Sequence, residues 1–240
     1  MVIIFKKERV KMKKLSDFHT IRSVRTELIS RLRSLTFFEI DDGVYDILGD
    51  VDFYNLGLNS LLEVTALLKK LTSSKVPVRI RRVQGDFKCS RNHLTDLEGA
   101  PEEVERNFSC LHNQLETLEG APKYVGGSFK CWGNNLKNLE GAPRYVGKDF
   151  HCSGNQLISL TGAPRRVEGD FSCDFNYLKT LQGAPEYVGG YFSCSFNKLI
   201  SLEGAPKYVG RVFYCHENSR KFTEEEVRKL VDVRGSVRVL

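Results

Sequence analysis

The residues of this chain best suited to chemistry are its cysteines and histidines. The cysteines recur every 21 residues, at Cys89, Cys110, Cys131, Cys152, Cys173, Cys194 and Cys215. A thiolate beside a basic group can act as a nucleophile, and thiolates with imidazoles can hold zinc. His216 directly follows Cys215, but neighbouring side chains of a strand point to opposite faces, which disfavours a nucleophile–base pair. His112, His151 and His216 occupy different repeats and different positions within them, which disfavours a metal site.

The cysteine spacing also argues against disulfide bonds. Seven is an odd number, and all seven cysteines occupy one position of the repeat. In a stacked array their side chains would point the same way into the core, which is a poor arrangement for bridging. We therefore expect buried, reduced thiols and a reducing compartment such as the cytoplasm.

Motifs of common enzyme classes are missing from the sequence. It contains no phosphate-binding glycine loop, His-Glu-x-x-His pair, Cys-x-x-Cys pair or Gly-x-Ser-x-Gly elbow. The apolar run at residues 2–5 is far too short to span a membrane. We expect a protein without enzyme activity, cofactor, metal or membrane association.

The cysteines belong to a 21-residue repeat that fills residues 83–218 without insertion or deletion. In each copy, phenylalanine precedes the cysteine by two residues and asparagine follows it by three, as in Phe129, Cys131 and Asn134. Two leucines and a Gly-Ala-Pro turn complete the copy. A fixed period of this length indicates a stacked solenoid.

Phe-x-Cys has the period of a strand, so we predict one short strand per repeat with both side chains pointing inward. Burial of about five apolar side chains per repeat contributes roughly 10 kcal/mol at ~2 kcal/mol each. Ordering one repeat costs about 30 kcal/mol, so repeats must stack to fold. The recurrent asparagine should bond backbone groups of adjacent repeats, which would otherwise be buried and unpaired.

The pattern Val-x-Gly-x-Phe-x-Cys-x-x-Asn-x-Leu-x-x-Leu-x-Gly-Ala-Pro resembles leucine-rich repeats, in particular the "SLEGAP" repeats of bacterial and tailed-phage proteins. The resemblance implies an α+β repeat fold, a leucine-rich repeat solenoid with a parallel β-sheet on its concave face. It also implies a bacterial or phage source, and the host cytoplasm as the location of a phage-encoded chain.

Four segments are expected along the chain. Residues 1–35 form a basic segment and an amphipathic helix from Ser16 to about Leu35, and residues 36–82 form an N-terminal cap. This cap contains a β-hairpin turning at Asp41-Asp42-Gly43, a degenerate first repeat and an inserted helix at 61–71. After the seven repeats of 83–218, residues 219–240 form a C-terminal cap, with a helix starting at Thr223 and a last strand.

The net charge of +6 is concentrated at the front of the chain. The basic residues Lys6, Lys7, Arg9, Lys11, Lys13 and Lys14 are candidates for contact with nucleic acid. A solvated basic tail is the simpler interpretation of this run. Met12 offers a second candidate start, which would leave this run largely outside the natural chain.

Aromatic residues at variable positions around Phe-x-Cys should lie on the open concave face, where the framework does not require them. We expect a protein-binding surface of Trp132, Phe175, Phe196, Tyr191, Tyr214, Leu111, Lys130 and His151. The alternative is that Phe175 and Phe196 only stack on each other or fold into the edge. The expected function is a non-enzymatic protein-binding module. Association with nucleic acid through the basic segment, or a structural role in a virion, remains an alternative.

Overall fold

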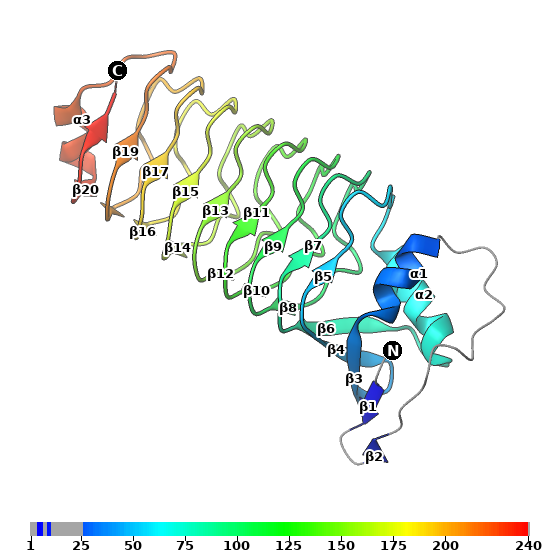
Figure 1. Cartoon of the computed structure of the whole chain (residues 1–240). Coiled ribbons are helices and arrows are strands. Elements are labelled where there is room, and N and C mark those ends of the chain that lie inside the picture. Colours follow the sequence, from blue (N-terminus) through cyan, green and yellow to red (C-terminus); the bar gives the residue numbers. More distant parts are fainter. Residues whose placement is uncertain (1–3, 7–8, 11–25, 240) are drawn as a thin grey trace.

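The computed structural model describes residues 4–6, 9–10 and 26–239 of the chain. They form a parallel β-solenoid of about seven repeats with few helices. In Figure 1 the colours change steadily along the solenoid axis, so each repeat contacts only its neighbours in sequence. This is the arrangement that the 21-residue period predicts.

One side of the solenoid is a nine-stranded parallel sheet containing the Phe-x-Cys segments. Its strands are β5 (Val51–Asp52), β7 (Phe87–Lys88), β9 (Phe108–Ser109), β11 (Phe129–Lys130), β13 (Phe150–His151), β15 (Phe171–Ser172), β17 (Phe192–Ser193), β19 (Phe213–Tyr214) and β21 (Val237–Arg238). Neighbouring strands pair in register, with each phenylalanine opposite the next. The expected inward Phe-x-Cys strand is confirmed.

The prediction of only one strand per repeat is wrong, because each repeat contributes a second strand before the phenylalanine. These strands are β6 (Arg79–Val83), β8 (Glu103–Val104), β10 (Tyr124–Val125), β12 (Tyr145–Val146), β14 (Arg166–Val167), β16 (Tyr187–Val188) and β18 (Tyr208–Val209), and β20 (Asp232–Val233) adds one more after the repeats. The recurrent tyrosines Tyr124, Tyr145, Tyr187 and Tyr208 lie in these strands. A buried valine anchors each one to the core, and its neighbour points outward.

The N-terminal elements extend the second series of strands. The predicted hairpin is confirmed, with β3 (Thr36–Asp41) antiparallel to β4 (Val44–Leu48) and Gly43 at φ +71° in the turn. β4 pairs in parallel with β6 (Arg79–Val83), so that one eight-stranded sheet runs β12-β10-β8-β6-β4-β3-β1-β2. A separate four-stranded sheet continues the series as β14-β16-β18-β20.

Two helices, α1 (Thr26–Arg33) and α2 (Leu62–Thr72), lie at this end of the solenoid (Figure 1). The expected helix start at Ser16 lies outside the described residues, as do Lys7, Lys11, Lys13 and Lys14. Lys6 and Arg9 lie in β1 (Ile4–Lys6) and β2 (Arg9–Val10), which form an antiparallel pair.

At the other end, α3 (Glu224–Leu230) begins at the predicted residue. The Thr223 hydroxyl accepts the backbone N–H of Glu226 at 3.2 Å, and the Glu226 carboxylate accepts the Thr223 N–H at 2.9 Å. This is the capping box expected from the sequence. β20 and β21 then add one further strand to each side of the solenoid.

The core is a set of parallel columns. The seven Phe-x-Cys phenylalanines are at most 1% exposed, with ring centroids 5.2 to 5.6 Å apart between neighbouring repeats. All seven cysteines are buried and free. Burial raises the pKa of each thiol, to about 12 for Cys215, the last. They are therefore protonated at neutral pH and belong to the framework.

The expected hydrogen bonds between the recurrent asparagines and backbone groups of adjacent repeats are confirmed. In a typical member, Asn155 donates through Nδ2 to the carbonyls of Cys131 and Cys152 at 3.1 and 3.0 Å. Its Oδ1 accepts the backbone N–H of Leu136 at 3.2 Å. Each asparagine therefore pairs buried backbone groups both within its repeat and in the preceding one.

Candidate functional site

The predicted binding residues lie on the outer side of the nine-stranded sheet and at the corner after it. Trp132, Phe175 and Phe196 are exposed, at 38%, 59% and 41%. Tyr191 and Tyr214 are partly buried. We call these five residues the aromatic face. The three other predicted residues, Leu111, Lys130 and His151, are also partly buried.

The centre of the aromatic face is a stacked pair. The rings of Phe175 and Phe196 lie 4.4 Å apart with an interplanar angle of 6°. His216 meets the ring of Phe196 edge-on at 5.3 Å. The stacking considered from the sequence is therefore present, and both phenylalanines nevertheless stay open to solvent.

Both phenylalanines have a left-handed backbone conformation. Phe175 and Phe196 have φ of +54°, and all the other repeats are left-handed at this position too, with Gly133 and Gly154 in two of them and Arg91, His112 and Glu217 in the rest. A left-handed conformation costs an L-residue about 1–2 kcal/mol relative to glycine. The conformation therefore belongs to the repeat and is compatible with glycine, and what distinguishes the two phenylalanines is exposed apolar surface that adds nothing to the core.

Two more ring contacts lie on this side of the solenoid. Trp132 meets His112 edge-on, with ring centroids 4.1 Å apart. Tyr191 and Tyr214 meet in the same way at 5.9 Å. Trp132 makes no ring contact with the phenylalanine pair among the described residues, so the predicted residues form separate groups along one side of the solenoid.

The column just before each phenylalanine, expected to be a variable part of the open face, has a structural role. Asp86 Oδ1 accepts the backbone N–H of Asn107 at 3.0 Å, and Asn107 Oδ1 accepts that of Ser128 at 2.9 Å. Asp149 and Asp170 continue this pattern toward the C-terminus. Each of these side-chain oxygens accepts a backbone N–H of the next repeat, so this column forms a second ladder of hydrogen bonds beside the asparagines.

Sequence reasoning also missed a polar network around Asp174. Its carboxylate accepts the hydroxyls of Ser172 and Ser193 at 2.9 and 2.6 Å and the backbone N–H of Ser195 at 2.7 Å. The hydroxyl of Ser195 lies 3.1 Å from His216 Nδ1. Because Ser195 is only 2% exposed, this serine–histidine pair offers no accessible nucleophile. The signal was the shared position of Asp174, Ser195 and His216 in consecutive repeats.

Three exposed apolar side chains were also missed, namely Tyr177, Ile158 and Ile200, at 54%, 67% and 59%. They occur in sequence columns that are otherwise largely polar, which was the available signal. They belong to the same repeats as the phenylalanine pair or to the repeat before it.

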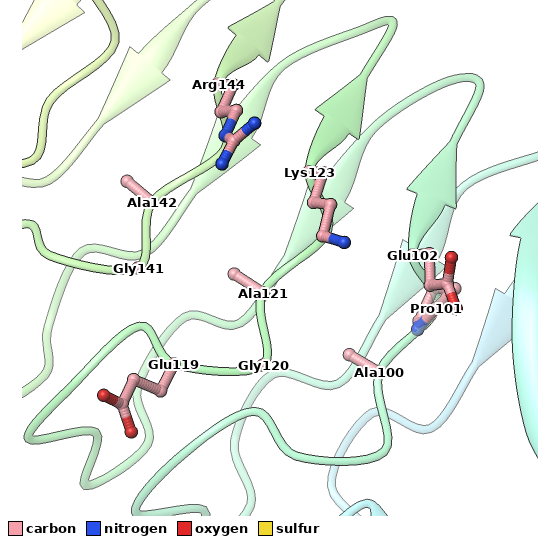
Figure 2. Close-up of a pocket in the computed structure, with 10 residues that line it drawn as sticks. All are labelled: Ala100, Pro101, Glu102, Glu119, Gly120, Ala121, Lys123, Gly141, Ala142 and Arg144. Atoms are coloured by element: carbon pink, nitrogen blue, oxygen red, sulfur yellow. The ribbon is translucent and has the colours of Figure 1, made fainter.

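A groove of about 520 Å³ lies elsewhere, at the Gly-Ala-Pro corners of the first three repeats (Figure 2). Its lining residues are Ala100, Pro101, Glu102, Glu119, Gly120, Ala121, Lys123, Gly141, Ala142 and Arg144. Lys123 and Arg144 have no ion-pair partner among the described residues, and each precedes an exposed tyrosine, Tyr124 or Tyr145. The groove therefore carries charges of both signs, with two cations, unpaired in the described part of the chain, beside exposed tyrosines.

Within residues 4–6, 9–10 and 26–239, no group of three or more His, Cys, Asp or Glu side chains is arranged to hold a metal ion. In the same part of the chain, no helix combines the length and the apolar character needed to cross a membrane. Comparison with protein families finds no matching family model, and no curated protein matches the chain. The chain is a repeat protein, a parallel β-solenoid with a 21-residue period.

Proposed function

We propose that this chain is a non-enzymatic protein-interaction module that binds a partner protein through its aromatic face. The observation that carries this proposal is the exposed stack of Phe175 and Phe196, at a position where the other five repeats have glycine or a polar residue. Exposed aromatic side chains that the framework does not require favour a role in binding.

The scaffold supports this function. Aromatic side chains held on a rigid surface bury a large area at low entropic cost, and they are typical anchors of protein interfaces. The buried columns on either side fix the backbone that carries them. The protonated state of the seven buried thiols and the burial of Ser195 argue against nucleophilic catalysis.

We further propose that the repeats are leucine-rich repeats of the "SLEGAP" type, with a bacterial or phage source; this rests on the repeat pattern. The N-terminal strands with α1 and α2, and α3 with β20 and β21, would serve as caps that cover the open ends of the core. The reduced, buried cysteines favour the cytoplasm, or the host cytoplasm for a phage-encoded chain.

The test is affinity capture from lysate of the native host with the full chain and two variants. The first variant, Phe175→Gly with Phe196→Gly, removes the stack and keeps a backbone that the framework accepts. The second, Tyr124→Ser with Tyr145→Ser, removes two exposed aromatics from the other sheet as a matched control. Circular dichroism checks that both variants are folded.

We expect the wild type and the control to retain the same protein and the phenylalanine variant to lose at least about 90% of it, since truncation of an aromatic anchor typically costs 2 kcal/mol or more. Equal retention by all three proteins would contradict the proposal. Capture of nucleic acid that salt releases would favour the alternative of nucleic-acid association, through the basic N-terminal residues or the surface at Lys123 and Arg144. Co-purification with virions would favour a structural role.

A further inference from the structure

We infer that the aromatic face recognises a positively charged segment of its partner, with a lysine or arginine side chain held between Tyr191 and the carboxylates of Asp149 and Asp170. This inference rests on the proposed function, since it specifies the chemistry of the protein that the face binds. The aromatic side chains supply the contact area, and the charge around them selects the occupant.

The two carboxylates lie at the edge of the aromatic face with capacity for a further partner. Asp149 Oδ1 accepts the backbone N–H of Asp170 at 3.0 Å, and Asp170 Oδ1 accepts that of Tyr191 at 2.8 Å. Asp149 Oδ2 accepts the hydroxyl of Ser128 at 3.1 Å and can accept a second hydrogen bond, whereas the second oxygen of Asp170 has no hydrogen-bond partner among the described residues. Both side chains are only partly buried, so a cation from outside the chain can approach them.

No lysine or arginine in the described part of the chain forms an ion pair with these carboxylates. In the first repeat, Asp86 occupies the same position and lies 3.9 Å from Lys88 Nζ and 3.7 Å from Arg106 Nε. Among the described residues, neither Asp149 nor Asp170 has a lysine or arginine within 4 Å. The negative charge therefore remains uncompensated in the repeats that carry the aromatic side chains.

His151, the nearest titratable group, does not neutralise the negative charge of these carboxylates either. His151 Nε2 lies 3.9 Å from Asp149 Oδ2, but burial lowers the pKa of His151 below its usual value. The imidazole is therefore uncharged at neutral pH. Asp174 adds a third negative charge, and its two oxygens already accept hydrogen bonds from Ser172, Ser193 and Ser195.

Tyr191 supplies the aromatic part of the proposed contact with a cation. Burial and the carboxylates of Asp170, Asp174 and Asp149 raise the pKa of Tyr191 above its usual value, which places its hydroxyl within their field. A guanidinium or ammonium group on this surface would contact a tyrosine ring and a carboxylate together, combining cation–π attraction with a charge-assisted hydrogen bond. Acidic or neutral segments would gain neither contact.

The experiment uses the full chain and a fluorescent peptide of alternating arginine and serine, with a matched peptide of glutamate and serine. Binding is followed by fluorescence anisotropy at low ionic strength. The Asp149→Asn, Asp170→Asn variant removes two charges and keeps both Oδ1 acceptors, as Asn107 does in the same column. The Glu119→Gln, Glu140→Gln variant removes two charges from exposed corner positions as the control.

We expect the arginine peptide to bind the wild type and the glutamate peptide not to bind. The asparagine variant should bind about tenfold more weakly, and the control within about twofold of wild type. Absence of arginine-peptide binding, or an equal loss in both variants, would overturn the inference. If the inference fails in this way and capture of the partner protein still depends on Phe175 and Phe196, the proposed function stands. Only the inferred positive charge of the partner segment is then wrong.

Discussion

Replacing Asn155 by alanine is expected to lower the free energy of unfolding by about 3 to 5 kcal/mol, because it leaves one buried N–H unpaired, at about 1–3 kcal/mol, and removes two further hydrogen bonds of about 0.5–1.5 kcal/mol each. Asn155 is 6% exposed. Its amide pairs the carbonyls of Cys131 and Cys152 and the backbone N–H of Leu136. Alanine leaves the Leu136 N–H unpaired at a place that water reaches poorly, whereas the two carbonyls each keep the amide of another asparagine, Asn134 or Asn176.

Asn135→Ala is the matched control. The Asn135 side chain is partly exposed, and its Oδ1 accepts a hydrogen bond from Gln156 Nε2 at 3.2 Å on the surface. We expect this change to cost no more than about 0.5 kcal/mol. Urea denaturation followed by circular dichroism measures both variants. Equal losses would show that the asparagine column does not stabilise the solenoid in the way described.

A second large effect is expected from Gly162→Ala, which should cost about 3 kcal/mol or more through backbone strain and overpacking. Gly162 has φ of +94°, and an added Cβ would lie 2.3 Å from the carbonyl oxygen of Leu139 and 2.4 Å from the backbone nitrogen of Glu140. Both are backbone atoms of the preceding repeat. Relief therefore requires the repeats to move apart.

Gly154→Ala separates the two causes of this loss. Gly154 also has positive φ, at +61°, but the nearest atom to its added Cβ is 3.7 Å away. Only the conformational strain remains, so we expect a loss of about 1 kcal/mol. The same denaturation measurement compares the two variants. If Gly154→Ala destabilised the protein as much as Gly162→Ala, close packing of the Gly-Ala-Pro corners would not be the reason for the glycine there.

The repeat, its inward Phe-x-Cys strand and the asparagine column could be predicted because each depends on residue types that recur in every copy. The second strand of each repeat was harder to predict from the sequence. Tyr124-Val125 is only two residues long, and its pairing arises from stacking rather than from local preference. The ladder that includes Asp86 and Asn107 was missed for the same reason. In the sequence it is a column of varied polar residues, and its hydrogen bonds form only between stacked repeats.

The candidate site was predictable in position and less so in detail. Phe175 and Phe196 stood out as aromatic residues that the framework does not require. Their left-handed backbone was signalled by Gly133 and Gly154 in the same column. The charge of this surface could not be predicted, because whether a described lysine or arginine lies near Asp170 depends on contacts between repeats.

The central claim is that the exposed phenylalanines are there for a partner rather than for the fold. The most direct test is the free energy of unfolding of the Phe175→Gly, Phe196→Gly variant, measured in urea beside Phe192→Ala. The rings of Phe175 and Phe196 stack on each other, whereas Phe192 is fully buried. Relief of strain offsets the lost stacking, so we predict a change within about 1 kcal/mol for the double variant. Phe192→Ala should lose about 3–5 kcal/mol. A loss of that size in the double variant would contradict the claim and make the stack part of the framework.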